Sequence, residues 1–188
     1  MGYLLYLMGA SGVGKDSLLR ALREREPGWP VAHRYITRSS DPSENCVSLS
    51  AAEFAWRREA GLFSLHWQAH GLDYGIGREV EGWLGRSELV ICNGSRQHLP
   101  QARRHFGARL LPLLVEVDAA TLRQRLLQRG RESAEQIETR LARLAGEPLD
   151  AGLLRHDNSG ALGESAERLH RRLRGWLAEA RAEREETA

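Results

Sequence analysis

A glycine-rich segment with one lysine, GASGVGKDS at residues 9–17, constrains this chain more than any other feature. The preceding residues 3–8 (YLLYLM) form a short, continuous apolar run, which is typical of a buried strand. After Lys15, leucines recur at helical spacing across residues 18–22. The order strand, glycine-rich loop, helix is the context in which the pattern G-x-x-x-x-G-K predicts a phosphate-binding loop.

The chemistry of the loop explains the residue types found in it. Glycines let backbone N–H groups approach phosphate oxygens closely, and the N-terminus of the following helix favours an anion. Lys15 is the only lysine among 27 lysine and arginine side chains, which indicates a task that needs a compact ammonium rather than a planar guanidinium. The predicted ATP-binding residues are Gly9, Ala10, Ser11, Gly12, Val13, Gly14, Lys15, Asp16 and Ser17.

The position after the lysine departs from the usual pattern. A serine or threonine normally follows the lysine and holds Mg²⁺, whereas Asp16 intervenes here and Ser17 comes next. Either the carboxylate or the hydroxyl serves the metal, and the sequence leaves both open. ATP and Mg²⁺ are therefore the expected cofactors.

The rest of the chain predicts an α/β fold. Apolar runs at residues 89–92 and 110–117 each end at a polar residue, and a helical pattern follows the second. Short apolar strands that alternate with helices predict a parallel sheet covered on both faces, the three-layer α/β/α arrangement of P-loop proteins. A composition of 41% hydrophobic and 28% charged residues is ordinary for a globular domain.

The 188 residues fit one P-loop kinase domain with two additions. We expect the core at residues 1–30, 84–122 and 147–188. A small acceptor-binding subdomain is expected at about 31–83, and an arginine-rich helical lid at about 123–146.

Several classes of protein are not favoured. A net charge of +2 with interspersed acidic residues does not predict nucleic-acid binding. The apolar run at residues 3–8 is too short to span a membrane, and no basic region precedes it. Cys46 and Cys92 form no disulfide or zinc pattern. We expect a cytoplasmic protein that acts on small molecules; its oligomeric state stays open, a homodimer included.

Beyond the loop, the chain resembles guanylate kinases along nearly its whole length, through Thr37-Arg38, Tyr74-Gly75, Arg129-Gly130 and Arg140. It departs from them at the acceptor. Those enzymes carry a further arginine where Asp41 stands, and a glutamate and a serine that read guanine where this chain has Leu65 and Ile76. Two apolar side chains cannot accept hydrogen bonds from a base, so guanine is not the expected acceptor group.

A sister branch, the ribose 1,5-bisphosphate phosphokinases of phosphonate degradation, is more similar. The shared segments are GKDSLL (14–19), RYITR (34–38), HWQAHGLDYGI (66–76) and NGSR (93–96). The resemblance implies transfer of the ATP γ-phosphoryl group to the 1-phosphate of the sugar, which gives 5-phosphoribosyl diphosphate. The catalytic residues it implies are Lys15, Arg38, Arg129 and Arg140, and the acceptor-binding residues are Arg34, Arg38, Tyr74 and Asn93.

Some positions keep two interpretations. Asn93 either contacts the acceptor or a magnesium-bound water, or simply begins an Asn-Gly turn. Trp67 either faces the sugar or packs within the insertion, and Asp157-Asn158 either approaches the adenine or forms a loop turn. At the level of function, the alternatives are a nucleoside monophosphate kinase and a non-catalytic guanylate-kinase-like interaction module.

Overall fold

The computed structural model of the chain describes residues 2–39, 44–130, 132–145 and 153–186. Asp41, residue 131 of the predicted lid and residues 146–152 lie outside this part. The chain folds into two compact units: unit 1 contains residues 1–8 and 23–112, and unit 2 contains residues 9–22 and 113–188. No helix within the described ranges is long and apolar enough to cross a membrane.

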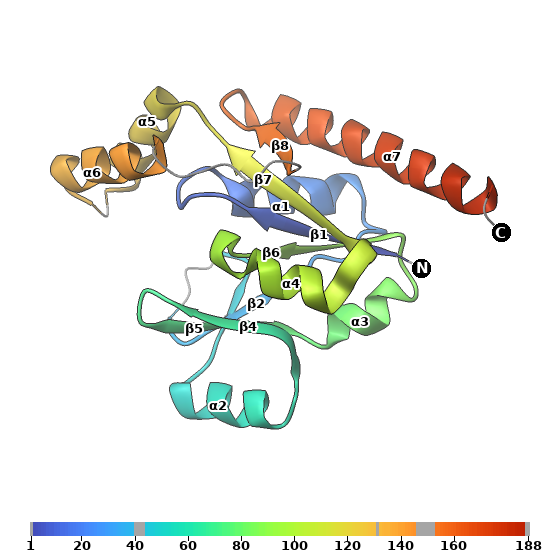
Figure 1. Cartoon of the computed structure of the whole chain (residues 1–188). Helices are drawn as coiled ribbons and strands as arrows, with labels where there is room; N and C mark the ends of the chain where they lie inside the picture. Colours follow the sequence, from blue (N-terminus) through green and yellow to red (C-terminus); the bar gives the residue numbers. More distant parts are fainter. Residues whose placement is uncertain (1, 40–43, 131, 146–152, 187–188) are drawn as a thin grey trace. The chain divides into compact units, whose positions relative to one another are not determined.

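Unit 1 contains a parallel strand pair and a separate mixed sheet, in which β2 pairs in parallel with β3 and antiparallel with β5 (Figure 1). In the parallel pair, Tyr3 lies opposite Leu89 and Leu7 opposite Asn93. Nearly every side chain of the two strands is buried, as expected for strands covered on both faces. The elements are β1 (Tyr3–Met8), β2 (Arg34–Ile36), β3 (Cys46–Ser48), α2 (Ala51–Glu59), β4 (Phe63–Ala69), β5 (Leu72–Gly77), α3 (Glu79–Leu84), β6 (Leu89–Asn93), η1 (Arg96–His98), α4 (Leu99–Phe106) and η2 (Gly107–Arg109).

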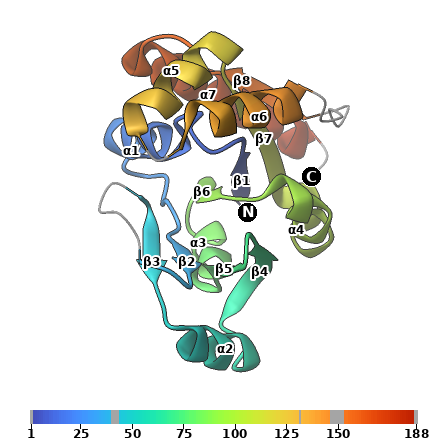
Figure 2. The same cartoon turned by 90° about the vertical axis from the view of Figure 1, so that its left-hand side faces the viewer.

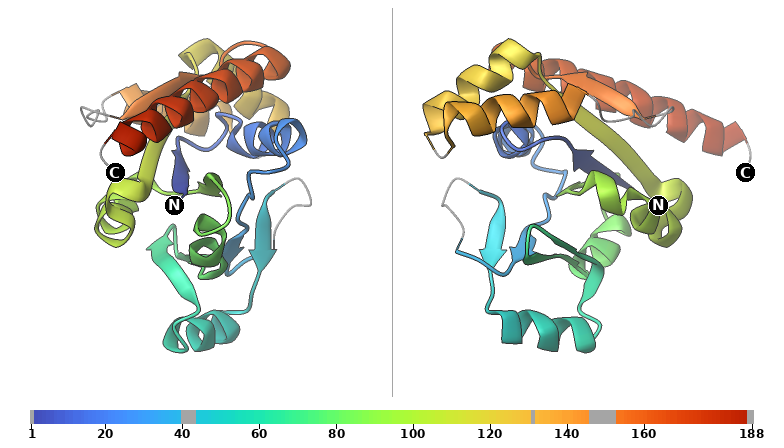
Figure 3. Two further views of the ribbon diagram at one scale, coloured as in Figure 1. Left: turned by 90° about the vertical axis from the view of Figure 1, so that its right-hand side faces the viewer. Right: turned by 60° about the vertical axis from the view of Figure 1, so that its left-hand side comes forward.

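The second sheet of unit 1 has the strand order β3-β2-β5-β4. Its β4–β5 hairpin turns at His70 and Gly71, which both have positive φ (52° and 71°), the backbone that a tight two-residue hairpin turn requires. Helix α2 follows β3 and packs against β4 (Figure 2, Figure 3). The Phe54 ring of α2 and the Phe63 ring of β4 stack with centroids 4.6 Å apart. This sheet lies within the segment predicted to bind the acceptor.

Unit 2 joins the phosphate loop to the C-terminal half of the chain. Strand β7 (Leu110–Glu116) begins in unit 1 and continues into unit 2, where it pairs in parallel with β8 (Leu154–Asp157). The helices of unit 2 are α1 (Lys15–Arg25, which ends in unit 1), α5 (Ala119–Arg129), α6 (Ala134–Ala145) and α7 (Leu162–Glu186). Strands that pair in parallel and alternate with helices confirm the predicted α/β class.

The ends of helices α5 and α6 are fixed by local side-chain chemistry. The Asp118 carboxylate accepts a hydrogen bond from the Thr121 N–H (2.7 Å) and begins α5, and Gly130 (φ 64°) ends it in a left-handed conformation. Ser133 and Gln136 form a reciprocal capping box: the Gln136 N–H donates to Ser133 Oγ, and the Ser133 N–H donates to Gln136 Oε1. These caps fix where α5 ends and where α6 begins, and the two helices carry the arginines of the predicted lid.

A buried histidine in unit 2 should make the stability of the protein depend on pH. His156 of β8 is within hydrogen-bonding distance (2.8 Å) of Ser165 Oγ, and burial together with Arg168 and Arg172 lowers the pKa of His156 from 6.5 to about 4. Because the unfolded chain takes up this proton first, the free energy of unfolding should fall as the pH drops from 6.5 towards 4, by roughly 1–2 kcal/mol. Urea unfolding at pH 7 and pH 5 measures the fall.

His156→Gln is the matched variant for this prediction, because glutamine retains a group that can bond to Ser165 but does not titrate in this range. Its loss of stability between pH 7 and pH 5 should be smaller than that of the unchanged protein. An equal loss in both proteins would show that other groups cause the acid sensitivity.

Candidate active site

The phosphate loop has the backbone that the glycine pattern predicted. Gly9 and Gly14 have φ of 149° and 89°, and a Cβ atom added at Gly9 would lie 2.4 Å from the Val115 carbonyl oxygen. The Lys15 ammonium donates to the carbonyl oxygens of Gly9 (2.7 Å) and Ala10 (2.9 Å), and α1 begins at Lys15. The ammonium therefore lies against its own loop at a helix N-terminus, an end of the helix that favours anions.

Two residues that the sequence analysis did not assign to the loop support it from unit 2. The Val13 carbonyl oxygen accepts hydrogen bonds from the Asn158 amide (2.7 Å) and from the Arg125 guanidinium (3.2 Å). Arg125 also donates to the Asn158 carbonyl oxygen at 2.8 Å, and Asn158 is only 2% exposed. Asn158 therefore fixes the loop. The position of Asp157-Asn158 at the end of a strand was the available sequence signal, but it did not indicate this contact.

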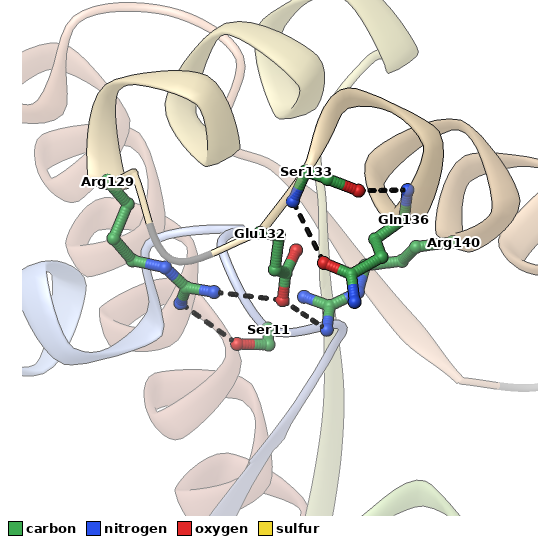
Figure 4. A network of polar contacts seen from close by, with 6 residues as sticks. All are labelled: Ser11, Arg129, Glu132, Ser133, Gln136 and Arg140. Atoms are coloured by element: carbon green, nitrogen blue, oxygen red, sulfur yellow. Dashed lines mark hydrogen bonds and ion pairs between the residues drawn. The ribbon is translucent and has the colours of Figure 1, made fainter.

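The two arginines assigned to the lid lie together beside the loop (Figure 4). Arg129, the last residue of α5, donates to Ser11 Oγ of the loop at 3.2 Å. Arg140 of α6 forms an ion pair with Glu132 (2.6 Å), and Glu132 also pairs with Arg129 (3.4 Å). One carboxylate thus joins two guanidinium groups next to the phosphate loop, an arrangement the sequence analysis did not foresee.

The residues that fit a Mg²⁺ ion are the pair that the sequence left open. Asp16 and Ser17 lie in the first turn of α1 and are both half-buried. Carboxylate and hydroxyl oxygens are the donors that Mg²⁺ prefers, and the ion usually keeps several waters, so either side chain fits without a dedicated cage. Within the described residues, no group of three or more His, Cys, Asp and Glu side chains offers a different metal site.

Three of the four predicted acceptor residues lie close together in unit 1. Strand β2 pairs with β5 so that Arg34 lies opposite Ile76 and Ile36 opposite Tyr74, which places the side chains of Arg34 and Tyr74 on one face. The Arg34 guanidinium lies over the Tyr74 ring, 5.2 Å from its centroid. Arg38 follows the end of β2 by two residues and lies near Tyr74, which adds a second cation to this cluster.

The cations of this cluster keep part of their hydrogen-bonding capacity. Arg34 donates to Cys46 Sγ at 3.5 Å, and its buried Nε has no hydrogen-bond partner within the described ranges. Arg38 is bound by the Glu44 carboxylate (2.8 Å) and donates to the Ser39 carbonyl oxygen (2.7 Å), with 36% of its side chain exposed. Two guanidinium groups near one tyrosine are a suitable receptor for a phosphate group.

Asn93, the fourth acceptor residue, ends β6 and is 1% exposed. The backbone that follows it is held by Tyr6, whose hydroxyl donates to the Ser95 carbonyl oxygen and accepts from the Ser95 N–H. Gly94 packs against the Tyr6 ring, and burial raises the pKa of the phenol above its usual value. The described residues 94–95 form no turn, so the turn interpretation of Asn93-Gly94 is not supported, and a contact of Asn93 with the acceptor stays a prediction.

The two positions at which guanylate kinases read guanine are buried in the second sheet of unit 1 of this chain. Leu65 and Ile76 are directly opposite each other on β4 and β5, and they are 2% and 0% exposed. Trp67 is 5% exposed and stacks on Tyr74 (centroids 5.6 Å apart) and on His98 (5.8 Å). The packing interpretation of Trp67 therefore holds, and neither Leu65 nor Ile76 offers a polar group to a base.

Known proteins resemble this chain in sequence and in fold. No family model matches the chain. It is 52% identical over 173 residues to the ribose 1,5-bisphosphate phosphokinase PhnN of Dickeya zeae, which covers 90% of this chain and 92% of that protein. The proteins of the same name from Pantoea vagans (51% identical; 88% and 93% covered) and Azotobacter vinelandii (48% identical; 92% and 96% covered) are similar over comparable lengths.

Among solved structures, the guanylate kinase of Anaplasma phagocytophilum superposes with a TM-score of 0.69 at 15% identity, covering 94% of this chain and 86% of that one. This similarity shows a guanylate kinase-like α/β fold, as predicted. Identity near one half over nine-tenths of the chain shows closer kinship with the PhnN proteins. The chain therefore belongs to the ribose 1,5-bisphosphate phosphokinase family of kinases.

Proposed function

We propose that this protein transfers the γ-phosphoryl group of ATP to the 1-phosphate of ribose 1,5-bisphosphate, which gives 5-phosphoribosyl diphosphate and ADP. The observation that carries the proposal is the 52% identity, over 90% of the chain, to a protein named for phosphorylating ribose 1,5-bisphosphate. The reaction takes place in the cytoplasm, serves phosphonate catabolism and uses only small-molecule substrates.

The donor half of the reaction is assigned to unit 2. The loop N–H groups and Lys15 bind the ATP phosphates, with the ammonium already placed beside the carbonyl oxygens of Gly9 and Ala10. Arg129 and Arg140 neutralise charge on the transferring group, and the contact between Arg129 and Ser11 brings one of them to the loop. Mg²⁺, held through Asp16 or Ser17, would supply further positive charge to the phosphates.

The acceptor half is assigned to unit 1. Arg34 and Arg38 bind the acceptor phosphate near Tyr74, and Asn93 contributes a polar group at the end of β6. An oxygen of this phosphate attacks the γ-phosphorus while the bond from that phosphorus to the β–γ bridging oxygen breaks, so that ADP leaves. Because the second pKa of a phosphate ester is about 6, the nucleophile is already ionised near neutral pH and needs no general base.

Two segments of the chain are assigned to acceptor binding and to the lid. Residues at about 31–83 form the acceptor-binding subdomain, which includes the β3-β2-β5-β4 sheet. Residues at about 123–146 form the lid, to which helix α6 and the end of α5 belong. The lid excludes water from the transferring group and so limits hydrolysis of ATP.

Two other functions fit less well. A guanylate kinase needs polar groups that read the base, and Leu65 and Ile76 are apolar and buried. A non-catalytic interaction module would not need the positive-φ glycines and the lysine of the loop, all of which this chain has.

The direct test of the proposal is product identification. The protein is incubated with ATP, Mg²⁺ and ribose 1,5-bisphosphate, and ³¹P NMR follows the conversion of the 1-phosphate into a diphosphate. The proposal expects one diphosphate on the sugar for each ADP formed. Formation of ADP with inorganic phosphate, and with no new sugar diphosphate, would refute it.

The lid arginines should contribute to the transition state more than to ATP binding. Arg129→Ala and Arg140→Ala should each lower kcat by about 100-fold or more, with the KM for ATP changed by no more than about threefold. Steady-state kinetics over a range of ATP concentrations separates the two effects. An increase in KM alone would turn these arginines into simple binding residues.

Arg123→Ala is the matched control for the lid variants. Arg123 belongs to the same helix α5, but its guanidinium pairs with Glu138 at 2.6 Å and is 44% exposed. Removing an exposed ion pair of this kind should have little effect on stability, and kcat should stay within about twofold of the unchanged protein.

A further inference from the structure

Glu132 supplies a carboxylate between the two lid arginines, Arg129 and Arg140 (Figure 4). Its Oε1 atom accepts from Arg140 Nη2 at 2.6 Å and lies 3.4 Å from Arg129 Nη2. All three side chains are mostly buried, with exposures of 17% for Glu132, 25% for Arg140 and 30% for Arg129. A single carboxylate oxygen thus fixes the distance between two cations that would otherwise repel each other.

The local fold explains why Glu132 can bridge two helices. It directly precedes Ser133, whose capping box with Gln136 fixes the start of α6. Arg140 follows Ser133 by seven residues, which is two helical turns, so it lies on the same side of α6 as the capped end. Arg129 ends α5 at the left-handed Gly130. The carboxylate therefore ties the end of one helix to the beginning of the next.

The bridge leaves donor capacity on the arginines. Arg140 Nη1 is buried and has no hydrogen-bond partner within the described residues, although Nη2 of the same guanidinium is bound to Glu132. Arg129 Nη1 is directed to Ser11 of the phosphate loop. A buried N–H without a partner is costly, and an oxygen of a bound phosphoryl group would satisfy it.

We infer that Glu132 is a positioning residue for phosphoryl transfer: it holds Arg129 and Arg140 as a converging pair beside the phosphate loop and leaves Arg140 Nη1 for the transferring group. The inference rests on the proposed function, because it assumes that the two arginines serve phosphoryl transfer. Glu132 does not touch the substrates in this scheme and acts only through the two guanidinium groups. Its removal should therefore have no effect once both arginines are gone.

The test is a mutant cycle in the full-length protein. Glu132→Gln keeps the size of the side chain but removes its charge, and it should lower kcat by about tenfold while the KM for ATP changes by no more than about threefold. In the Arg129→Ala/Arg140→Ala background, the same substitution should change kcat by less than about twofold. Equal effects in both backgrounds, or an unchanged kcat in the single variant, would overturn the inference.

A Glu132 carboxylate that competes with phosphate, rather than positioning the arginines, would give the opposite result. If Glu132 competes with phosphate for the arginines, Glu132→Gln should raise kcat or strengthen inhibition by inorganic pyrophosphate, and either outcome would overturn the positioning role. Glu135→Gln, an exposed charge removal in the first turn of α6, is the matched control and should change neither quantity. Glu132→Asp keeps the charge with a shorter reach and should lose less activity than Glu132→Gln, which separates positioning from misfolding.

Failure of this inference can be distinguished from failure of the proposed function. The same cycle is measured on the slow hydrolysis of ATP without any acceptor, which depends on the arginines but not on the sugar. If no sugar diphosphate forms but the cycle shows coupling in ATP hydrolysis, the assigned acceptor is wrong and the role of Glu132 stands. If transfer to ribose 1,5-bisphosphate occurs without coupling, the role of Glu132 is wrong.

Discussion

Lys15→Ala should lower the rate of phosphoryl transfer by about a thousandfold or more while the fold persists. The ammonium of Lys15 lies on the phosphate loop, bound to the carbonyl oxygens of Gly9 and Ala10, where the β- and γ-phosphates of ATP would be held. No other lysine exists in the chain to replace it. Initial rates with saturating ATP, and circular dichroism for the fold, test both parts of this prediction.

Two further variants sharpen the Lys15 experiment. Lys15→Arg keeps the charge but replaces a compact ammonium with a planar fork, so it should also be severely impaired. Arg20→Ala removes a positive charge from an exposed position of the same helix α1 and should keep near-normal activity. Near-normal turnover in either Lys15 variant would remove the loop from the mechanism.

GMP should be a poor acceptor, with a kcat/KM at least about ten-thousandfold below that for ribose 1,5-bisphosphate. Guanine presents N–H donors that lose their bonds to water when the base is bound, and they regain them only where the site offers acceptors. Leu65 and Ile76 face each other across β4 and β5 with almost no exposure, so these positions offer none. Rates of ADP formation with each acceptor at equal concentrations measure the ratio.

The same protein preparation supplies the control for acceptor choice. AMP, which carries the same ribose 5-phosphate as GMP but a different base, should be as poor as GMP, since the prediction rests on the absence of any base reader. A strong preference for GMP over AMP would show that residues other than Leu65 and Ile76 recognise guanine.

Much of the donor site could be predicted from the sequence, because its signals are local. The strand β1, the glycine loop and the start of α1 follow one another without interruption, and the loop has the expected positive φ angles. The capping box of Ser133 and Gln136 is also a four-residue pattern. In β4, the alternation that buries Leu65 and Trp67 is readable as a period of two.

The rest of the site depends on contacts that no local pattern contains. Arg125 and Asn158 meet at the Val13 carbonyl oxygen although they are 33 residues apart in sequence and far from the loop. Glu132 pairs with two arginines that lie on different helices, Arg129 on α5 and Arg140 on α6. Arginines are frequent in this chain, so their number alone could not indicate which of them converge.

One competition experiment shows directly whether ribose 1,5-bisphosphate or GMP is the acceptor. Ribose 1,5-bisphosphate and GMP are offered together, at equal concentrations, with limiting ATP and Mg²⁺, and the phosphorylated products are separated and quantified. We expect nearly all of the γ-phosphate to appear in 5-phosphoribosyl diphosphate and almost none in GDP. Preferential formation of GDP would contradict it and would make this chain a guanylate kinase in activity as well as in fold.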